Sequence, residues 1–370
     1  MIYVVQPGDT LGDIAVGYGV QVQQLQFLNQ IPNSELIIPG QALLIPQPPR
    51  EGPFSIQVNG YAYPFISRWV LNQTLPNLNL LSVFTYGFTG DGQLLPPRLN
   101  DRWMLERARA FGVAAAMVLA PMTPEENFSN VLLVQLLENP AAQRRLLNQI
   151  ARTMEAKGFT ELNIDFEFVP AANRDDLTEF VRRAKERLPY DVSICLAPKT
   201  YAGQRGLLYE GKDYAALGQI ADRLLLMTYE WGYKYGPPLA VAPINRVREV
   251  VQYAVTEIPR EKLSLGLANY GYDWPLPYIQ NETIARTIGS IEAVSIARRV
   301  GAEIQFDPAA QSPWFRYRRN GIVHGVWFED VRSWQAKFDL VKEFDLGGIG
   351  IWTVMNLNRP GLRLLSENFR

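Results

Sequence analysis

The chain has 370 residues, with 36 basic and 37 acidic side chains and a formal net charge of -1. This balance gives no electrostatic reason to expect nucleic acid or an anionic membrane surface as a partner, and a neutral or zwitterionic ligand fits better. The length predicts a small module followed by one large domain.

The single histidine and the single cysteine exclude several kinds of site. One cysteine rules out an internal disulfide, and one histidine argues against a His-rich metal site and a Ser-His-Asp triad. His324 lies in a strand-like run and is expected to be packed or at the surface rather than catalytic. Cys195 is expected to be a small core residue.

The sequence shows no segment that would hold it in a membrane. No run reaches the roughly 18 apolar residues of a membrane span, and the N-terminus lacks the basic and apolar regions of a signal peptide. We therefore expect a soluble protein without classical secretion, although a trimmed chain would look the same.

Residues 1–46 are predicted to form a compact unit in the order strand, helix, helix, strand. The expected elements are a strand at 2–5, a helix opened by the capping box of Thr10 and Asp13, a helix over 22–28 and a strand at 42–46. The unit resembles a LysM module over its whole length, through Tyr3-Val4-Val5-Gln6-Pro7-Gly8-Asp9-Thr10-Leu11, Ile14-Ala15, Tyr18-Gly19-Val20, Asn29 and Ile38-Pro39-Gly40-Gln41-Ala42-Leu43.

The LysM resemblance implies that this module binds N-acetylglucosamine in peptidoglycan or chitin through two loops. The corresponding positions are Gly8, Asp9, Thr10 and Leu11 in the first loop and Asn29, Gln30, Ile31 and Pro32 in the second. A small packing domain without a ligand is the alternative. One copy is present, so tandem modules cannot add avidity.

Residues 47–53 are predicted to be a stiff proline-rich linker, and residues 54–370 one α/β domain. Helical stretches with charged faces, such as 101–111 and 174–188, alternate with apolar runs. The expected strands are 54–60, 81–88, 113–120, 159–167, 192–197, 224–229, 263–270 and 348–353. Eight such units predict a (β/α)8 TIM barrel with its active site at the strand C-termini.

A long insertion, about 274–337, separates the seventh and eighth expected strands. It contains a helical pattern around 291–300 and β-like runs at 303–307, 314–318 and 322–328. We expect a small α+β subdomain on the barrel rim that deepens the cleft.

The fourth expected strand carries an unusual polar face. Asn163, Asp165 and Glu167 alternate with apolar residues, so a period of two puts all three on one side. Because burying unpaired charge is costly, this strand is predicted to end in a polar cavity, the candidate active site.

The two carboxylates of this strand favour acid-base chemistry. Their side chains start about 6 to 7 Å apart, so both cannot ionise freely and one pKa should rise. Glu167 is then placed to protonate a leaving-group oxygen, with Asp165 as its partner. Since both come from one side, glycoside cleavage needs either Glu230 as a second carboxylate or a nucleophile in the substrate, such as a 2-acetamido group.

The stretch Leu162-Asn163-Ile164-Asp165-Phe166-Glu167 resembles the Asp-x-x-Asp-x-Asp-x-Glu signature of family 18 glycoside hydrolases. Thr160 and Asn163 stand where that signature has its first and middle Asp, and Glu161 where Gly is usual. Further similarity is to the branch with bacterial spore cortex-lytic N-acetylglucosaminidases, whose members carry LysM modules and accept Asn in the acidic motif. It runs through Leu226-Met227-Thr228-Tyr229-Glu230-Trp231-Gly232, 237–245, Asn269-Tyr270-Gly271-Tyr272-Asp273-Trp274, 310–313 and Val326-Trp327-Phe328-Glu329-Asp330.

The family resemblance implies substrate-assisted hydrolysis with retention and without metal or cofactor. Glu167 would act as acid and then as base, Asp165 would orient the acetamido group, and Tyr229 would hydrogen-bond its carbonyl. Asn163 would support Asp165. Trp352 would form the floor of the subsite for the distorted sugar.

Further aromatic residues at the strand ends are candidate walls of the cleft, because sugar rings pack on aromatic faces. For each of them, and for Trp352, core packing is the alternative. These candidates are Tyr61, Tyr86, Tyr270 and Trp231. Met227 and Glu230 are included as substrate-binding candidates, although Met227 also fits a core position.

The sequence thus predicts a glycosidase that cleaves β-1,4 linkages at N-acetylglucosamine in spore cortex peptidoglycan. A chitinase and a catalytically silent coat protein that binds glycan are the alternatives. The resemblance implies a place at the spore coat or cortex, with an extracellular or cell-wall location as the alternative.

Overall fold

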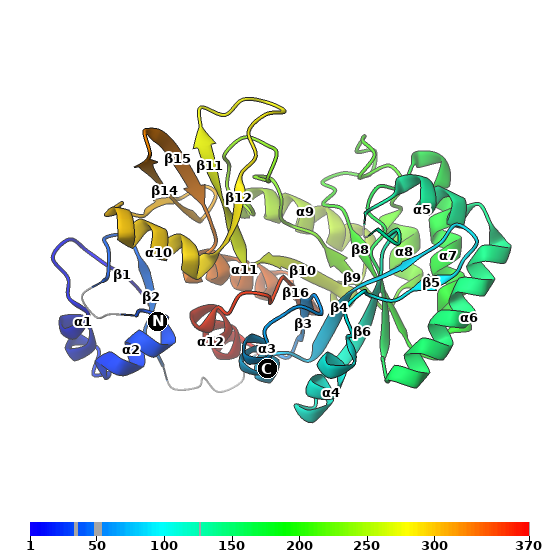
Figure 1. The fold of residues 1–370 in the computed structure, drawn as a ribbon, viewed down its shortest axis with the longest axis horizontal. Coiled ribbons are helices and arrows are strands. Elements are labelled where there is room, and N and C mark those ends of the chain that lie inside the picture. Colours follow the sequence, from blue (N-terminus) through cyan, green and yellow to red (C-terminus); the bar gives the residue numbers. More distant parts are fainter. Residues whose placement is uncertain (33–35, 48–53, 126, 370) are drawn as a thin grey trace.

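The computed structural model describes residues 1–32, 36–47, 54–125 and 127–369. Most of the linker expected at 47–53 therefore lies outside the described residues. The described chain contains a small N-terminal module, a closed barrel and an insertion with its own sheet (Figure 1). Among the described residues, none of the helices has the length and apolar character that crossing a membrane requires.

The N-terminal module has the predicted order of elements. β1 (Ile2–Val4) pairs antiparallel with β2 (Ala42–Leu44), and α1 (Leu11–Gly17) and α2 (Val22–Leu28) lie between them in the chain. The side chain of Thr10 accepts a hydrogen bond from the backbone N–H of Asp13, which confirms the predicted N-cap. Inward-facing aliphatic side chains, among them Leu25, form the core of the module.

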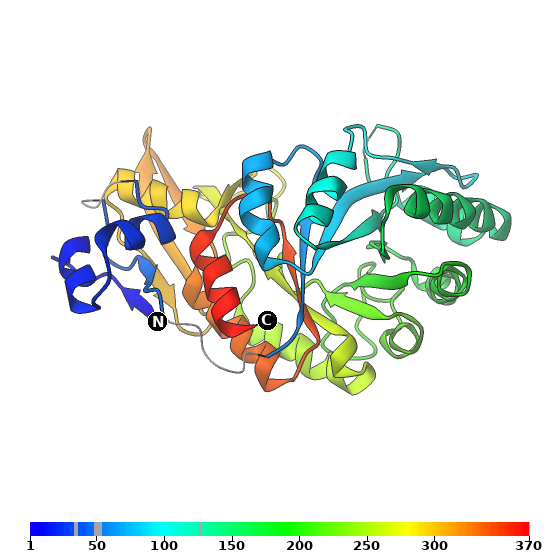
Figure 2. The same ribbon diagram turned by 90° about the horizontal axis from the view of Figure 1, so that it is seen from below.

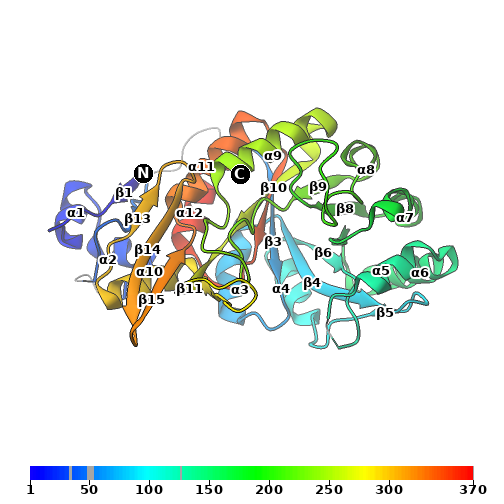
Figure 3. The same ribbon diagram turned by 90° about the horizontal axis from the view of Figure 1, so that it is seen from above.

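The module is docked on the large domain through backbone groups. The N–H of Ile304 donates to the carbonyl of Pro39 at 3.0 Å, and Arg332 donates to the carbonyl of Gly40 at 3.2 Å. A Cβ on Gly40 would lie 1.7 Å from the carbonyl oxygen of Ile304, and its φ is +81°, so this contact requires glycine. The module therefore lies beside the insertion, as the view from above also shows (Figure 3).

Within the described residues, eight parallel strands close a barrel, which confirms the predicted TIM-barrel class. The closure is made by β3, which pairs with β4 on one side and with β16 on the other. The strands are β3 (Gln57–Ala62), β4 (Leu80–Phe88), β6 (Ala114–Leu119), β7 (Glu161–Ile164), β8 (Asp191–Leu196), β9 (Arg223–Leu226), β10 (Leu263–Ala268) and β16 (Gly348–Trp352). A two-residue strand, β5 (Leu94–Leu95), pairs antiparallel with the end of β4.

The helices lie outside the barrel strands (Figure 2). They are α3 (Arg68–Thr74), α4 (Arg102–Ala110), α5 (Asn130–Leu137), α6 (Pro140–Lys157), α7 (Arg174–Arg187), α8 (Tyr214–Ile220), α9 (Ile244–Glu257), α11 (Val331–Glu343) and α12 (Arg359–Asn368). α4 and α7 occupy the stretches predicted for them. The first turn of α7 contains Asp175 and Asp176 and the last turn Lys185 and Arg187, as the helix dipole prefers.

The insertion after β10 forms a five-stranded antiparallel sheet in the order β12-β11-β15-β14-β13. Its elements are β11 (Tyr270–Leu276), β12 (Arg286–Gly289), α10 (Ser290–Val300), β13 (Gln305–Asp307), β14 (Ser312–Arg319) and β15 (Ile322–Trp327). The predicted helix and the last three strands are present. The expected bounds differ, because the sheet starts at Tyr270 rather than at residue 274, and α11 from Val331 packs on the barrel.

Candidate active site

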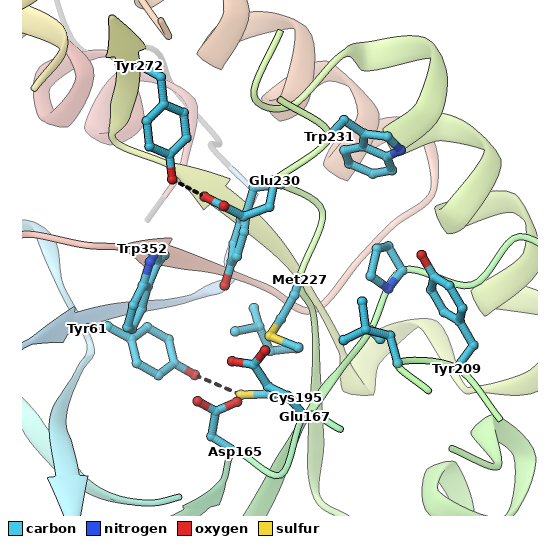
Figure 4. Close-up of a pocket in the computed structure, with 15 residues that line it drawn as sticks. Tyr61, Asp165, Glu167, Cys195, Tyr209, Met227, Glu230, Trp231, Tyr272 and Trp352 are labelled. Atoms are coloured by element: carbon cyan, nitrogen blue, oxygen red, sulfur yellow. Dashed lines mark hydrogen bonds between the residues drawn. The ribbon is translucent and has the colours of Figure 1, made fainter. Parts of the chain in front are cut away.

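A cavity of about 420 Å³ opens at the C-terminal ends of the barrel strands (Figure 4). It holds both carboxylates of the predicted motif, together with side chains from six other strand ends or loops. The labelled lining residues are Tyr61, Asp165, Glu167, Cys195, Tyr209, Met227, Glu230, Trp231, Tyr272 and Trp352. Tyr229 also lines this cavity.

β7 places the carboxylates through its strict alternation. Leu162, Ile164 and Phe166 are fully buried in the main hydrophobic core between barrel and helices, so the residues between them face the barrel interior. The strand is shorter than predicted, because its ladder ends at Ile164. The N–H of Asp165 still donates to the carbonyl of Leu119 at 2.8 Å, so Glu167 is the first polar residue beyond the pairing and reaches into the cavity.

Asn163 lies beneath Asp165 with its amide fixed by hydrogen bonds. Its Nδ2 donates to Ser193 Oγ at 2.8 Å, and Ser193 Oγ donates to Glu161 Oε1 at 2.5 Å. Its Oδ1 accepts from the Tyr61 hydroxyl at 3.3 Å and from Cys195 Sγ at 3.5 Å. These partners fix the orientation of the Asn163 amide beneath Asp165.

Two residues of this network carry more than the sequence predicted for them. Glu161 continues the alternation of Asn163 by one step, is buried and lies 3.4 Å from Arg223, so the period-two pattern could have identified it. Cys195, expected to be a core residue, is buried but also lines the cavity. Cys195 belongs to a buried core cluster, which confirms the expectation of a core residue, and its thiol in addition donates to Asn163 Oδ1 at 3.5 Å.

The carboxylates of Asp165 and Glu167 differ in their protonation. Burial raises the pKa of Asp165 to about 6, while the nearby Lys212 and the Cys195 thiol oppose the rise. Burial and then the charge of Asp165 raise the pKa of Glu167 to about 8, with Lys212 opposing and Glu230 adding to the rise. At neutral pH Glu167 therefore holds a proton and Asp165 is ionised, in agreement with the expectation that one carboxyl of the pair has its pKa raised above neutrality.

The side chain of Glu230 is held in place by hydrogen bonds from two tyrosines of β11. Its Oε1 accepts hydrogen bonds from the hydroxyls of Tyr270 and Tyr272, the latter at 2.8 Å. Desolvation raises the pKa of Glu230, and these two hydrogen bonds lower it. Tyr270 thus stands behind Glu230 rather than on the cavity wall, and Tyr272, which the sequence did not single out, lines the cavity instead.

Aromatic rings form much of the cavity floor and one wall. The ring of Trp352 lies 5.8 Å from that of Tyr61 and 4.9 Å from that of Phe84, both edge to face. Trp231 stands on the opposite wall in Figure 4, and Met227 lies between the two. The structure therefore brings Tyr61, Trp231 and Trp352 together around the carboxylates, as the sequence predicted.

The prediction that Tyr86 is a cleft wall is wrong. Its hydroxyl donates to Asp101 and accepts from Lys157 at 2.7 Å, and its ring packs on Phe159, all on the side of the outer helices. The cause is a register shift between Val83 and Tyr86 in the pairing of β4 with β6. The shift reverses the alternation, so Tyr86 faces out although Phe84 faces in.

The loops predicted to bind glycan in the module contribute unequally. Gly8, Asp9 and Thr10 are at least partly open to solvent, as is Pro32, whereas Leu11 and Ile31 are buried in the module core. The side chain of Gln30 accepts from the N–H of Arg359 at 2.7 Å, so it faces the large domain.

Asn29 is fully engaged within the module. Its Nδ2 donates to the carbonyls of Leu25 and Leu44 at 3.1 and 2.9 Å, and its Oδ1 accepts from the N–H of Leu44 at 2.7 Å. Its side chain therefore joins α2 to β2. Both hydrogens of Nδ2 are therefore used within the module.

His324 lies in the insertion, stacked on Tyr317 at 4.7 Å. Its Nδ1 is 2.9 Å from Asp273 Oδ1. It does not line the cavity, which agrees with the expectation of a packed histidine.

Comparison with known proteins points to one family of enzymes. The family model for glycosyl hydrolases family 18 matches residues 122–356, and the model for the LysM domain matches residues 3–46. The cortical fragment-lytic enzyme of Bacillus subtilis (strain 168) is 38% identical over 426 aligned residues, which cover 100% of this chain and 98% of that protein.

Solved structures agree with the sequence relatives. The crystal structure of the Bacillus cereus spore cortex-lytic enzyme SleL superposes with a TM-score of 0.83 at 35% identity, covering 100% of this chain and 86% of that chain. The enzyme SleL of Bacillus megaterium QM B1551 superposes with a TM-score of 0.82 at 36% identity and the same coverage.

Proposed function

The chain belongs to glycosyl hydrolases family 18, and from this premise we propose that it cleaves β-1,4 linkages at N-acetylglucosamine in spore cortex peptidoglycan. The reaction is hydrolysis with retention, in which the 2-acetamido group of the substrate serves as nucleophile. Relatives that act on spore cortex by name, aligned over the whole chain, support this choice of polymer.

The single observation that carries the mechanism is the unequal pair at the end of β7. Glu167, protonated at neutral pH, donates its proton to the glycosidic oxygen as the bond to the anomeric carbon breaks. The acetamido oxygen forms the new bond to that carbon and gives an oxazolinium. Water then attacks the anomeric carbon as its proton passes to Glu167, the bond from that carbon to the acetamido oxygen breaks, and the acetamido group and the protonated Glu167 are restored.

The carboxylate of Asp165 stabilises the positive charge that develops on the acetamido nitrogen. Its Oδ1 is buried and has no hydrogen-bond partner among the described residues, so it is free to accept the acetamido N–H. Tyr229, which lines the same cavity, hydrogen-bonds the acetamido carbonyl, and Asn163 supports Asp165 from below. Trp352 carries the apolar face of the sugar.

The N-terminal module increases the time that the enzyme spends on its polymer. In this proposal the open face of the module, at Gly8 to Thr10, contacts the glycan, and its fixed docking on the insertion holds that face at a constant distance from the cleft. The protein acts at the spore coat or cortex.

Digestion of purified spore cortex by the full chain tests the function. We expect new reducing ends at N-acetylglucosamine by mass spectrometry from the wild type and a loss of about 10²- to 10⁴-fold in Glu167→Gln. Glu282→Gln, at an exposed position of the insertion, is the matched control and keeps full activity.

The same experiment separates the alternatives. Products from chitin oligomers but none from cortex would identify a chitinase. Binding to cortex without products from either substrate would identify a silent glycan-binding protein. Unchanged turnover in Glu167→Gln would contradict the mechanism.

A further inference from the structure

A lysine is buried directly behind the catalytic pair. Lys212 lies in the loop between β8 and α8 and is 1% exposed. Its Nζ donates to the carbonyl oxygen of Phe166, the residue between Asp165 and Glu167, and to that of Cys195 at 3.4 Å. No ion pair joins this ammonium to a carboxylate among the described residues, so its charge is neutralised only at longer range.

The loop that carries Lys212 is held firmly in place. Lys199, itself buried, donates from Nζ to the carbonyl of Lys212 at 3.0 Å. Asp213, the next residue, caps α8 by accepting from the N–H of Ala216 at 3.0 Å. A Cβ on Gly211 would lie 2.2 Å from the carbonyl oxygen of Val169, so the loop packs tightly on the segment that follows Glu167.

Burying the Lys212 ammonium lowers the stability of the fold, so its presence here calls for a contribution to the site. Removing an ammonium from water without a paired carboxylate costs several kcal/mol even when backbone carbonyls accept its protons. A methionine would fill a similar volume without that cost. Burial does act on the lysine, since it lowers the pKa of Lys212 to about 8.

We propose that Lys212 is a positioning residue for the hydrolysis, which fixes the turn of backbone between the two carboxylates and supplies the positive charge that keeps Asp165 ionised while Glu167 holds the catalytic proton. This inference rests on the proposed function. With Lys212 charged and Asp165 ionised, protonated Glu167 leaves the group of three with no net charge before the sugar binds.

The groups that face this ammonium come from the ends of several strands. The segment directly after β7 contributes Asp165 and Glu167, and β8 contributes the Cys195 thiol. The positive charge lowers the pKa values of both carboxyls against the rise that burial causes. Tyr61, Tyr229 and Glu230 line the same cavity, and the charge of Glu230 raises the pKa of Glu167, whereas that of Lys212 lowers it.

The pH profile of the reaction distinguishes a lysine that only bridges two carbonyls from one whose charge also shifts the carboxyl pKa values. Loss of a bridge lowers turnover at every pH by the same factor. Loss of the charge raises the pKa of Asp165 and that of Glu167 together, so both limbs of the bell-shaped profile of kcat/KM against pH move to higher pH.

The test is the pH profile of Lys212→Met, which keeps length and apolar volume and removes the charge. We expect both limbs to move up by about one pH unit, the size of effect that one nearby opposite charge has on a carboxyl pKa. Lys262→Met is the matched control, because Lys262 also donates to two backbone carbonyls, those of Gly218 and Ala221 at 2.9 Å, but directly before β10, at the end of the barrel opposite the cavity. Its limbs stay where those of the wild type are.

A second variant and a second measurement make the result decisive. Lys212→Gln keeps a neutral donor, and ¹³C NMR titration of the Asp and Glu carboxyl carbons, assigned with Asp165→Asn and Glu167→Gln, reports both pKa values without substrate. Unchanged limbs and unchanged titrations in folded Lys212→Met would overturn the inference. If both neutral variants fail to fold while Lys212→Arg folds, the charge serves folding, which also overturns it.

Failure of the proposed function gives a different result. In that case the wild type releases no product from cortex or chitin oligomers, yet the NMR titration still shows whether Lys212 sets the two carboxyl pKa values.

Discussion

Among the regions of the large domain that bury charged side chains, two use them differently. Glu329, which precedes α11, and Lys337, in the middle of α11, are both fully buried and lie 2.6 Å apart, with Ser312 Oγ 3.5 Å from the second carboxylate oxygen of Glu329. At the end of β7, Asp165 Oδ1 has no hydrogen-bond partner within the described part of the chain, and Lys212 is bonded to backbone carbonyls instead. Satisfied charges hold two elements together, whereas unsatisfied charges in a cavity remain available to a substrate.

The largest expected effect is a loss of turnover when the carboxylate of Asp165 is replaced. Asp165→Asn removes the charge that stabilises the oxazolinium, so we expect kcat to fall about 10²- to 10³-fold with a modest change in KM. Because the amide is less costly to bury than a carboxylate, the free energy of unfolding stays equal or rises. Steady-state kinetics on N-acetylglucosamine oligosaccharides and denaturant unfolding measure both.

Equal losses in kcat and in substrate affinity would show instead that Asp165 has a purely structural role. Asp191→Asn is the matched control, since that carboxylate is paired with Arg223 at the opposite end of the barrel strands, 2.7 Å away. It leaves kcat unchanged.

The buried pair of Glu329 and Lys337 should show the reverse pattern, a loss of stability without a loss of turnover. Lys337→Met leaves the Glu329 carboxylate buried without its partner, so we expect the free energy of unfolding to fall by about 3–5 kcal/mol. The kcat of the folded fraction at 25 °C stays that of the wild type. Denaturant unfolding followed by tryptophan fluorescence, with activity measured on the same samples, checks both.

A double variant sharpens this test. Replacing both partners, in Glu329→Leu with Lys337→Met, removes the unpaired charge and should recover most of the lost stability. A double variant as unstable as the sum of the single variants would show that the pair contributes through packing rather than through charge.

Most of the barrel could be predicted from the sequence, because its strands are apolar runs separated by amphipathic helices. The start of the insertion could not. Only Asn269 separates β10 from β11, and its amide donates to the carbonyls of Thr353 and Asn356 at 3.0 and 2.9 Å. This break in the chain direction is made by contacts with residues far away in sequence, which no local pattern contains.

The candidate site divides in the same way. Asn163, Asp165 and Glu167 follow from alternation within one strand, which is a local property. The prediction for Tyr86 was wrong because a register shift inside β4 reverses that alternation. Lys212 was missed because it reaches the site from a loop between β8 and α8, and a lone lysine in a loop has no pattern that separates it from an exposed one.

A smaller effect is expected from a buried amide in the module. Asn29 resembles the satisfied charges, because its amide joins α2 to β2 through three hydrogen bonds. Asn29→Ala leaves both backbone groups of Leu44 without this partner, so we expect a loss of about 1–3 kcal/mol in the local stability of the module. Hydrogen exchange of the full chain measures it.

The control for this prediction is Gln23→Ala, at an exposed position of α2, which should change stability by less than about 0.5 kcal/mol. We expect glycan binding by the folded Asn29→Ala protein to persist. A loss of glycan binding at unchanged stability would make the Asn29 side chain a ligand contact after all.

The smallest effect is the pH dependence of the wild type. Activity needs Asp165 ionised and Glu167 protonated, so kcat/KM falls about tenfold per unit below the first pKa, about 6, and above the second, about 8. The result is a bell with its plateau between these values. In Asp165→Asn the acidic limb disappears, and the basic limb moves to lower pH because the charge that raised the pKa of Glu167 is gone. A basic limb that stays in place in this variant would mean that burial alone keeps Glu167 protonated, and the two carboxylates would then titrate independently.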